Sequence, residues 1–138
     1  MLRRALLDTN LYIGWLNGGR HEYLVTGRGF VRYLSGVVAM ELEAGATTPR
    51  ARRALDQLAR GYEAAGRLVC PSASDFRTAG SILRGLRSRG QDVRRASLVH
   101  DVLLAATARS IGVTLYTRDL DFEAIRTVHD FPLEIVTE

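Results

Sequence analysis

Ala5-Leu6-Leu7-Asp8-Thr9-Asn10 is the stretch that best indicates the fold, because a short apolar run ends in an acid and a segment of helical period follows at once. The same alternation of short apolar runs and longer helical segments continues along the chain, and it is typical of an α/β fold with a mainly parallel sheet. The sequence predicts strands at 5–8, 33–38, 67–70, 113–117 and 133–136. It predicts helices at 10–16, 39–45, 49–65, 74–89, 98–111 and 120–128.

Strands joined by crossover helices predict a three-layer α/β/α sandwich around a central, mainly parallel five-stranded sheet. Such sheets bind ligands beyond the carboxyl ends of their strands, where the strand order reverses. The 138 residues contain no repeat, low-complexity tract or linker, so we expect a single domain over residues 1–138. The least regular stretch, residues 17–29, is rich in glycine and is predicted to be a surface excursion.

The composition narrows the classes of function. All 19 basic side chains are arginines, which excludes enzymes that need a Schiff-base, P-loop or kinase lysine. The formal charge of +4 permits a polyanionic partner. A single cysteine, together with the lack of a secretory leader and of a long apolar run, favours a reduced, cytoplasmic protein that does not enter the membrane.

Carboxylates follow three of the expected strands. Asp8 ends the first strand, Glu41 comes just after the second, and Asp119 follows the fourth with Asp121 close behind it. Each has an ordinary explanation when taken alone, because Asp8 suits the N-cap of the next helix and the others suit first helical turns. The carboxyl ends of parallel strands meet at one edge of a sheet, so we expect these acids to gather there.

Asp101 is the acid whose position is hardest to explain without a ligand. It shares a stripe of its predicted helix with Leu98, Ala105 and Ala108. A carboxylate on an apolar stripe is costly unless a cation or several donors compensate it; the ordinary alternative is a partly exposed acid at the edge of the stripe. Gathered acids also raise one another's pKa. Mg²⁺ or Mn²⁺ would remove this conflict and could orient a water toward a phosphodiester.

Four short motifs resemble those of PIN-domain ribonucleases, and their order, their spacing and the chain length are similar to those of VapC-type toxins. They are Leu6-Leu7-Asp8-Thr9-Asn10, Met40-Glu41-Leu42, His100-Asp101 with the run from Leu103 to Ala108, and Thr117-Arg118-Asp119-Leu120-Asp121-Phe122. The resemblance covers essentially the whole chain. It implies a PIN-like fold and a metal-dependent endoribonuclease that cuts RNA with a metal-activated water. It also implies the toxin component of a type II toxin–antitoxin module.

The resemblance further implies roles for individual residues. The catalytic, metal-binding acids would be Asp8, Glu41, Asp101 and Asp119, with Asp121 as a fifth acid of variable role and Asn10 and Thr117 as polar supports. The one departure is Arg118, at a position where small or polar residues also occur in the family. It leaves the acidic motif intact and is expected to alter contacts with the substrate.

Partners are also implied by the resemblance: an RNA substrate, a cognate antitoxin, a homodimer and a larger assembly with the antitoxin. Tyr12, Trp15 and Leu16 are candidates for the wall of an antitoxin groove, although such clusters more often belong to the core. The helices expected at 49–65 and 74–89 carry the candidate apolar positions for the homodimer: Leu55, Leu58, Ile82 and Leu86.

Three alternatives belong to other classes of function. An HD-type phosphohydrolase would use His21, His100 and Asp101, but that fold is helical and this chain has β-rich segments. A phospho-acceptor receiver module needs a lysine that the chain lacks. A catalytically silent PIN-like interaction module would be indicated by a missing acid, and none of the four is missing. Arginines within 50–53 and 84–95 could follow an RNA backbone, although a solvated helix face is the more common explanation for any one of them.

Overall fold

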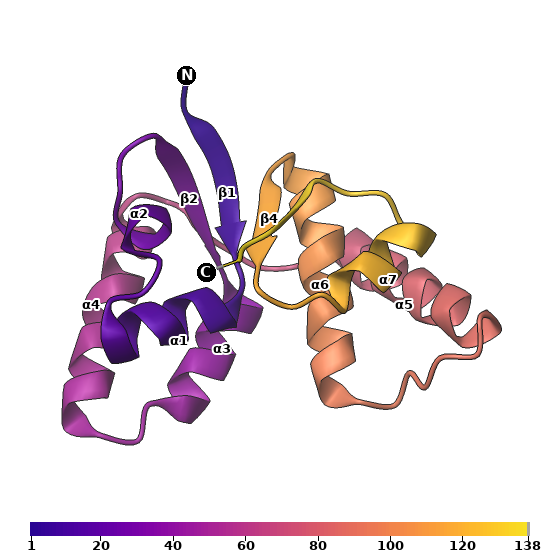
Figure 1. Ribbon diagram of the computed structural model, residues 1–138, viewed down its shortest axis with the longest axis horizontal. Coiled ribbons are helices and arrows are strands. Elements are labelled where there is room, and N and C mark those ends of the chain that lie inside the picture. The colour runs from indigo at the N-terminus through magenta and orange to yellow at the C-terminus, as the bar shows by residue number, and fades with distance from the viewer. Residues whose placement is uncertain (138) are drawn as a thin grey trace.

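The computed structural model describes residues 1–137, and within them five strands form one sheet (Figure 1). They are β1 (Arg3–Leu7), β2 (Phe30–Ser35), β3 (Leu68–Val69), β4 (Thr114–Thr117) and β5 (Leu133–Ile135). Their order in the sheet is β3-β2-β1-β4-β5, and every neighbouring pair is parallel. The predicted parallel, doubly wound sheet is therefore confirmed.

Helices cover both faces of this sheet. Residues 1–137 contain α1 (Thr9–Gly18), α2 (Glu22–Val25), α3 (Gly36–Gly45), α4 (Pro49–Ala64), α5 (Ala73–Ser88), α6 (Ala96–Ile111) and α7 (Phe122–Val128). In Figure 1, α5, α6 and α7 lie on one side of the sheet, and α1, α2 and α4 lie on the other. Helix α3 contacts both α1 and α6, so it connects the two helical layers. The predicted three-layer sandwich is confirmed, and no helix in the described part of the chain is long and apolar enough to cross a bilayer.

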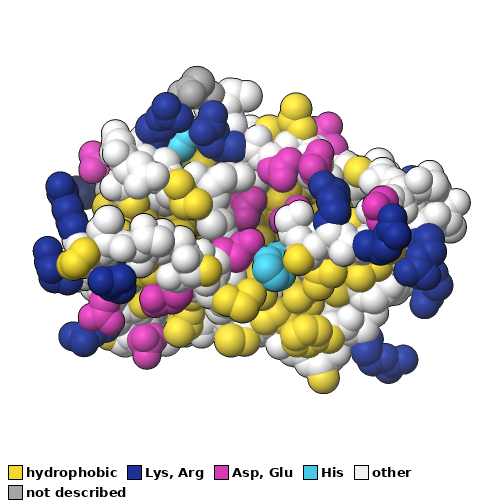
Figure 2. All heavy atoms as spheres, turned by 90° about the horizontal axis from the view of Figure 1, so that it is seen from below, with side chains coloured by type: hydrophobic (Ala, Val, Ile, Leu, Met, Phe, Trp, Pro, Cys, Tyr) yellow, Lys and Arg dark blue, Asp and Glu magenta, His cyan; other side chains and the backbone are white. Residues whose placement is uncertain are grey.

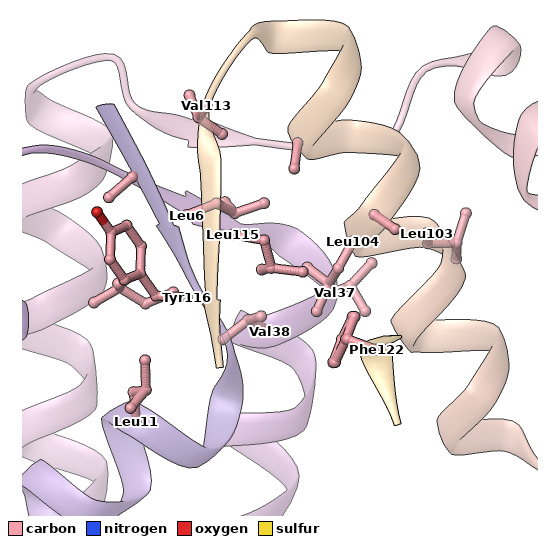
Figure 3. Packing of buried hydrophobic residues seen from close by; sticks show 14 of the residues in the cluster. Leu6, Leu11, Val37, Val38, Leu103, Leu104, Val113, Leu115, Tyr116 and Phe122 are labelled. Atoms are coloured by element: carbon pink, nitrogen blue, oxygen red, sulfur yellow. The ribbon is translucent and has the colours of Figure 1, made fainter. Parts of the chain in front are cut away.

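The core forms where the strands alternate their side chains between the two layers. Leu115 of β4 and Leu104 of α6 are fully buried, and Figure 3 shows them together with Phe122 between the sheet and α6. Tyr116, the next residue of β4, points to the opposite face. Burying a large apolar side chain contributes about 1.5–3 kcal/mol, so these contacts hold β4 rigidly beside β1.

The second strand ends earlier than the sequence predicts. Ser35 is the N-cap of α3, and its hydroxyl accepts the N–H of Val37 at 3.1 Å. Val37 and Val38 are therefore buried helical residues rather than the end of a strand. A short apolar run has no periodicity that separates a buried strand from a buried helix. As a consequence, Glu41 lies in the second turn of a helix and not at a strand end.

The glycine-rich excursion between α1 and β2 contains the short helix α2, which the sequence does not predict. Leu24 and Val25 of this helix are buried in the core. The Arg32 guanidinium donates hydrogen bonds to the carbonyls of Leu24 and Gly27, so β2 holds the end of α2 in place. Most of the stretch is exposed, as predicted, but these hydrogen bonds and the two buried side chains hold α2 against the fold.

Candidate functional site

The order of the strands reverses at β1, whose neighbours are β2 and β4. Open α/β sheets bind ligands in the crevice outside the carboxyl ends of the strands at such a reversal. Asp8 directly follows β1, and Thr117 is the last residue of β4. The reversal therefore brings the first and the last of the acidic motifs together at one edge of the sheet.

Asp8 is the most firmly held acid at this edge. Its side chain is 6% exposed and caps α1 by accepting the N–H of Thr9 at 2.8 Å. The Thr117 hydroxyl donates to Asp8 Oδ2 at 2.7 Å, and the Asn10 amide donates to the same oxygen at 3.2 Å. Burial raises the pKa of Asp8, while the bonds from Thr117 and Thr9 lower it and the charges of Glu41 and Asp119 raise it.

The loop after β4 is tied to Asp8 through one hydroxyl. Thr117 Oγ1 accepts the backbone N–H of Asp119 at 3.0 Å and the Asn10 amide at 3.3 Å. The Asp119 carboxylate in turn accepts the backbone N–H of Asp121 at 2.9 Å. Asn10 and Thr117, which the resemblance names as supports, thus connect Asp8 directly to the turn that carries Asp119.

Glu41 reaches the same edge from α3 and is held from two sides. The Thr9 hydroxyl donates to its Oε1 at 2.6 Å, and His100 Nδ1 lies 3.0 Å from its Oε2. Neither partner of Glu41 is predicted from the sequence. The position of His100 directly before Asp101 on a helix is the one available signal, since no local pattern indicates a pair of residues 59 positions apart.

Asp101 lies on α6 with the stripe that the sequence predicts. Leu98, Ala105 and Ala108 of that stripe are all buried. The pKa of Asp101 is raised to about 8. Burial is the largest cause, and the charges of Asp8, Asp119, Glu41 and Asp121 add to it. No hydrogen bond offsets this rise. A cation bound beside this carboxyl would therefore favour its ionised form.

Asp121 is the outlying acid. Its side chain is 62% exposed and lies 3.9 Å from Arg95 Nη1. Figure 2 looks onto the carboxyl edge of the sheet and shows acidic side chains gathered near the middle of the face, with most arginines toward its rim. Four acids thus share one site, and the fifth lies at its border with a cationic partner of its own.

The donor set of this site consists of oxygen atoms, which suits Mg²⁺ or Mn²⁺. Among residues 1–137, no three His, Cys, Asp or Glu side chains are already placed to hold an ion between them. Mg²⁺ usually keeps several waters and takes only one or two carboxylates directly. Burial and the neighbouring carboxylates raise the pKa of Asp101, and a divalent cation would relieve that repulsion, so the residues fit an ion bound partly through water.

An apolar groove lies beside Glu41, between α1, α3 and α4. Its walls include Ile13, Leu16, Leu42 and Leu55. Of the three residues that the sequence analysis assigns to such a wall, Leu16 lines it and Trp15 is half-buried against the core. Tyr12 is fully buried, and its hydroxyl is 2.8 Å from that of Tyr62. Tyr12 therefore supports α1 from inside, because helical periodicity turns it toward the sheet.

A comparison with known protein families agrees with this geometry. The PIN domain matches residues 5–128, which include all five acids. The chain belongs to the PIN domain family. No curated protein matches the chain at a significant level.

Solved structures share the fold of this PIN domain over nearly its whole length. FitAcB from Neisseria gonorrhoeae is 23% identical, with 94% of this chain and 95% of that chain covered and a TM-score of 0.71. VapBC2 from Rickettsia felis, bound to a promoter DNA fragment, is 19% identical with 97% and 99% covered and a TM-score of 0.70. DNA-bound VapBC from Salmonella typhimurium is 23% identical with 98% of both chains covered and a TM-score of 0.66.

Proposed function

We propose that this PIN domain is a metal-dependent endoribonuclease, that it cleaves RNA phosphodiester bonds, and that it acts in the cytoplasm as the toxin of a toxin–antitoxin module. One observation carries the proposal: Asp8, Glu41, Asp101 and Asp119 share one edge of the sheet, and together with burial their charges raise the pKa of Asp101 to about 8. A fold gains no stability from such repulsion, so the arrangement is best explained by a bound cation.

Different residues of the site would hold and orient the carboxylates that bind a divalent ion. When bound, Mg²⁺ or Mn²⁺ supplies Lewis-acid activation of a water and stabilisation of the departing oxygen. Thr117 and Asn10 hold the Asp8 carboxylate toward the edge of the sheet. Thr9 and His100 orient the two oxygens of Glu41. The buried stripe of α6 keeps bulk water away from one side of Asp101, which strengthens its interaction with any cation.

The test uses two acids of the same helix. Glu41→Gln is expected to lower Mg²⁺- or Mn²⁺-dependent cleavage of RNA more than about 100-fold, beyond what loss of an outer partner usually costs. Glu43 is exposed on α3, so Glu43→Gln should retain the activity of the parent and serves as the matched control. EDTA should stop cleavage by the parent and by Glu43→Gln. Full activity in EDTA would contradict the proposal, and a folded parent that cuts no RNA would favour a silent interaction module.

The partner of this toxin is proposed to be an antitoxin that lies in the apolar groove. Another protein of this fold is described as a member of the VapBC family of toxin-antitoxin systems. In this chain the groove places Leu16 and Ile13 next to Glu41, so a partner with an apolar segment and an arginine could occupy the groove and pair with the acids. Leu16→Ala should weaken antitoxin binding by about 2 kcal/mol. Tyr23→Ala, a change at an exposed site of α2, is the control in the same calorimetric titration.

A homodimer is also proposed, but through other residues than the sequence analysis selects. Leu55, Ile82 and Leu86 are buried within the chain's own core, because α4 packs on β2, β3 and α3, and α5 packs on α6 and α7. Leu58 is partly buried against the same core. Large apolar side chains remain exposed on α3, α5 and α6, namely Met40, Phe76 and Val99. Met40→Glu should shift the sedimentation mass toward that of a monomer, and an unchanged mass would remove α3 from the contact.

A further inference from the structure

A second cavity lies near the acid cluster and shares Ile13 and Asn17 of α1 with the apolar groove. Its volume is about 430 Å³, and its lining includes Asn10, Asn17, Arg20 and Arg118. Asn10 contacts both the acid cluster and the cavity. Its amide donates to Asp8, and its Oδ1 accepts the backbone N–H of Arg118 at 3.3 Å. The cavity is therefore connected to the acid cluster through one side chain.

The side chains that line this cavity are opposite in charge to those of the acid cluster. Two arginines and two asparagines line it, and no acid is among its lining residues. Guanidinium groups bind phosphate through two parallel hydrogen bonds. Ile13 also lines the cavity, and its side chain is 45% exposed, which provides an apolar contact beside the charged groups. Together these groups suit a nucleotide, with its phosphate on the arginines.

The backbone fixes the cationic groups independently of their charge. Arg20 follows the left-handed Gly19 at the end of α1, and its N–H donates to the Gly14 carbonyl at 3.2 Å. The Arg20 side chain lies against Gly14, where an added Cβ would come within 3.5 Å of it. Arg118 is fixed through its backbone bond to Asn10. Alanine at either position keeps the backbone bond and removes the guanidinium group together with the other contacts of the side chain.

We propose that Arg20 and Arg118, with Asn10 and Asn17, form a subsite for a phosphate of the RNA strand next to the bond that is cut. The inference rests on the proposed function. An RNA strand that approaches four acids is repelled by them, and a cationic pocket directly beside the acids offsets that repulsion. The subsite would hold the strand in register while the scissile phosphate lies at the acid cluster.

The experiment measures the binding of a fluorescent single-stranded RNA of about 12 nucleotides in EDTA, where cleavage does not interfere, at several salt concentrations. The Arg20→Ala, Arg118→Ala double variant should bind about tenfold more weakly at low salt. The slope of log K against log salt should become shallower by about 1.4, because each phosphate contact on a single strand contributes about 0.7. A cooperative thermal transition is expected for the variant, since the backbone bonds of both residues remain, and it shows that the weaker binding is that of a folded protein.

Two further variants test whether the loss of RNA binding comes from this cavity. Arg52→Ala, Arg53→Ala removes the same charge from exposed positions of α4 and should lose much less affinity and slope. Gly18 lines the cavity, and a Cβ added to it meets no atom within 4 Å, so Gly18→Glu should place a carboxylate beside the arginines and also weaken binding.

The inference is wrong if the Arg20, Arg118 variant keeps the slope of the parent, if the α4 variant loses as much affinity, or if Gly18→Glu binds RNA normally. An unchanged slope would also be the result if the cavity binds an acidic peptide instead of RNA. A parent protein that binds RNA through these arginines but never cuts it would refute the nuclease proposal alone. Cleavage by the parent with unchanged RNA binding in the double variant would refute the subsite alone.

Discussion

Asp8 and Asp101 belong to the same acid cluster, yet the protein supports them in opposite ways. Asp8 ends a strand and accepts hydrogen bonds from the Thr9 backbone and from the side chains of Asn10 and Thr117. Asp101 lies on an apolar helical stripe, and no such bond lowers its pKa, which reaches about 8. The chain's own donors therefore offset part of the cost of burying Asp8, whose pKa is still raised, whereas Asp101 has no such offset and its pKa rises further.

The largest expected effect is on catalysis. Asp8→Asn and Asp101→Asn should each reduce metal-dependent RNA cleavage more than about 1,000-fold, as the loss of a group that acts in a unit often does. The two variants should differ in stability. In EDTA at pH 8, Asp101→Asn should melt above the parent because it removes a repelled charge, and Asp8→Asn should not. If Asp8→Asn is stabilised as much, the contrast between the two sides is wrong.

The next effect is on the pH dependence of stability without metal. The folded pKa of Asp101, about 8, lies above the usual unfolded value near 3.9. The folded state therefore binds the proton more tightly, and this stabilisation is complete at low pH and is lost as the pH rises through 8. The parent in EDTA should lose about 3 kcal/mol more between pH 5 and pH 8 than Asp101→Asn does, as measured by urea unfolding. Parallel curves for the two proteins would contradict the assignment.

A smaller effect, on stability, tests the hydrogen bonds that hold Asp8. Thr117 is fully buried, and its hydroxyl serves Asp8, Asn10 and the Asp119 backbone. Thr117→Val keeps the shape but removes the three hydrogen bonds of this hydroxyl, so we expect a loss of about 2 kcal/mol in the free energy of unfolding. Thr117→Ser keeps the hydroxyl and should recover most of the loss. Equal stabilities of the valine and serine variants would show that packing alone matters there.

The smallest effect concerns the second support of Glu41. His100 is 26% exposed, and Thr9 holds the other oxygen of Glu41, so His100→Ala should weaken Mn²⁺ binding only about fivefold, below the usual range for outer partners. Asparagine places an amide N–H near the position of Nδ1, so His100→Asn should restore most of the affinity. Calorimetry with Mn²⁺ measures both variants. Equal Mn²⁺ affinity in the parent and the alanine variant would remove His100 from the support of the site.

The sequence predicted the acids more completely than their supports. Asp8 and Asp119 follow apolar runs, and Asp101 interrupts an apolar stripe, so local periodicity alone marks all three. Glu41 was identified by type, but its position at a strand end was wrong because Ser35 caps a helix that begins at Gly36. The partners Thr9 and His100 could not be paired with Glu41, since their hydrogen bonds join segments that are distant in the sequence.

The sequence by itself determined the parallel α/β sheet, its helical layers and the acids at its carboxyl edge, because each follows from a period or residue type within a short window. The tertiary structure alone decided that Tyr12 is buried, that Leu55, Ile82 and Leu86 serve the core, and that Arg20 and Arg118 line one cavity. The reason is physical. Periodicity states which face of a helix is apolar, but only the packing of one element on another decides what that face meets and which distant side chains share a pocket.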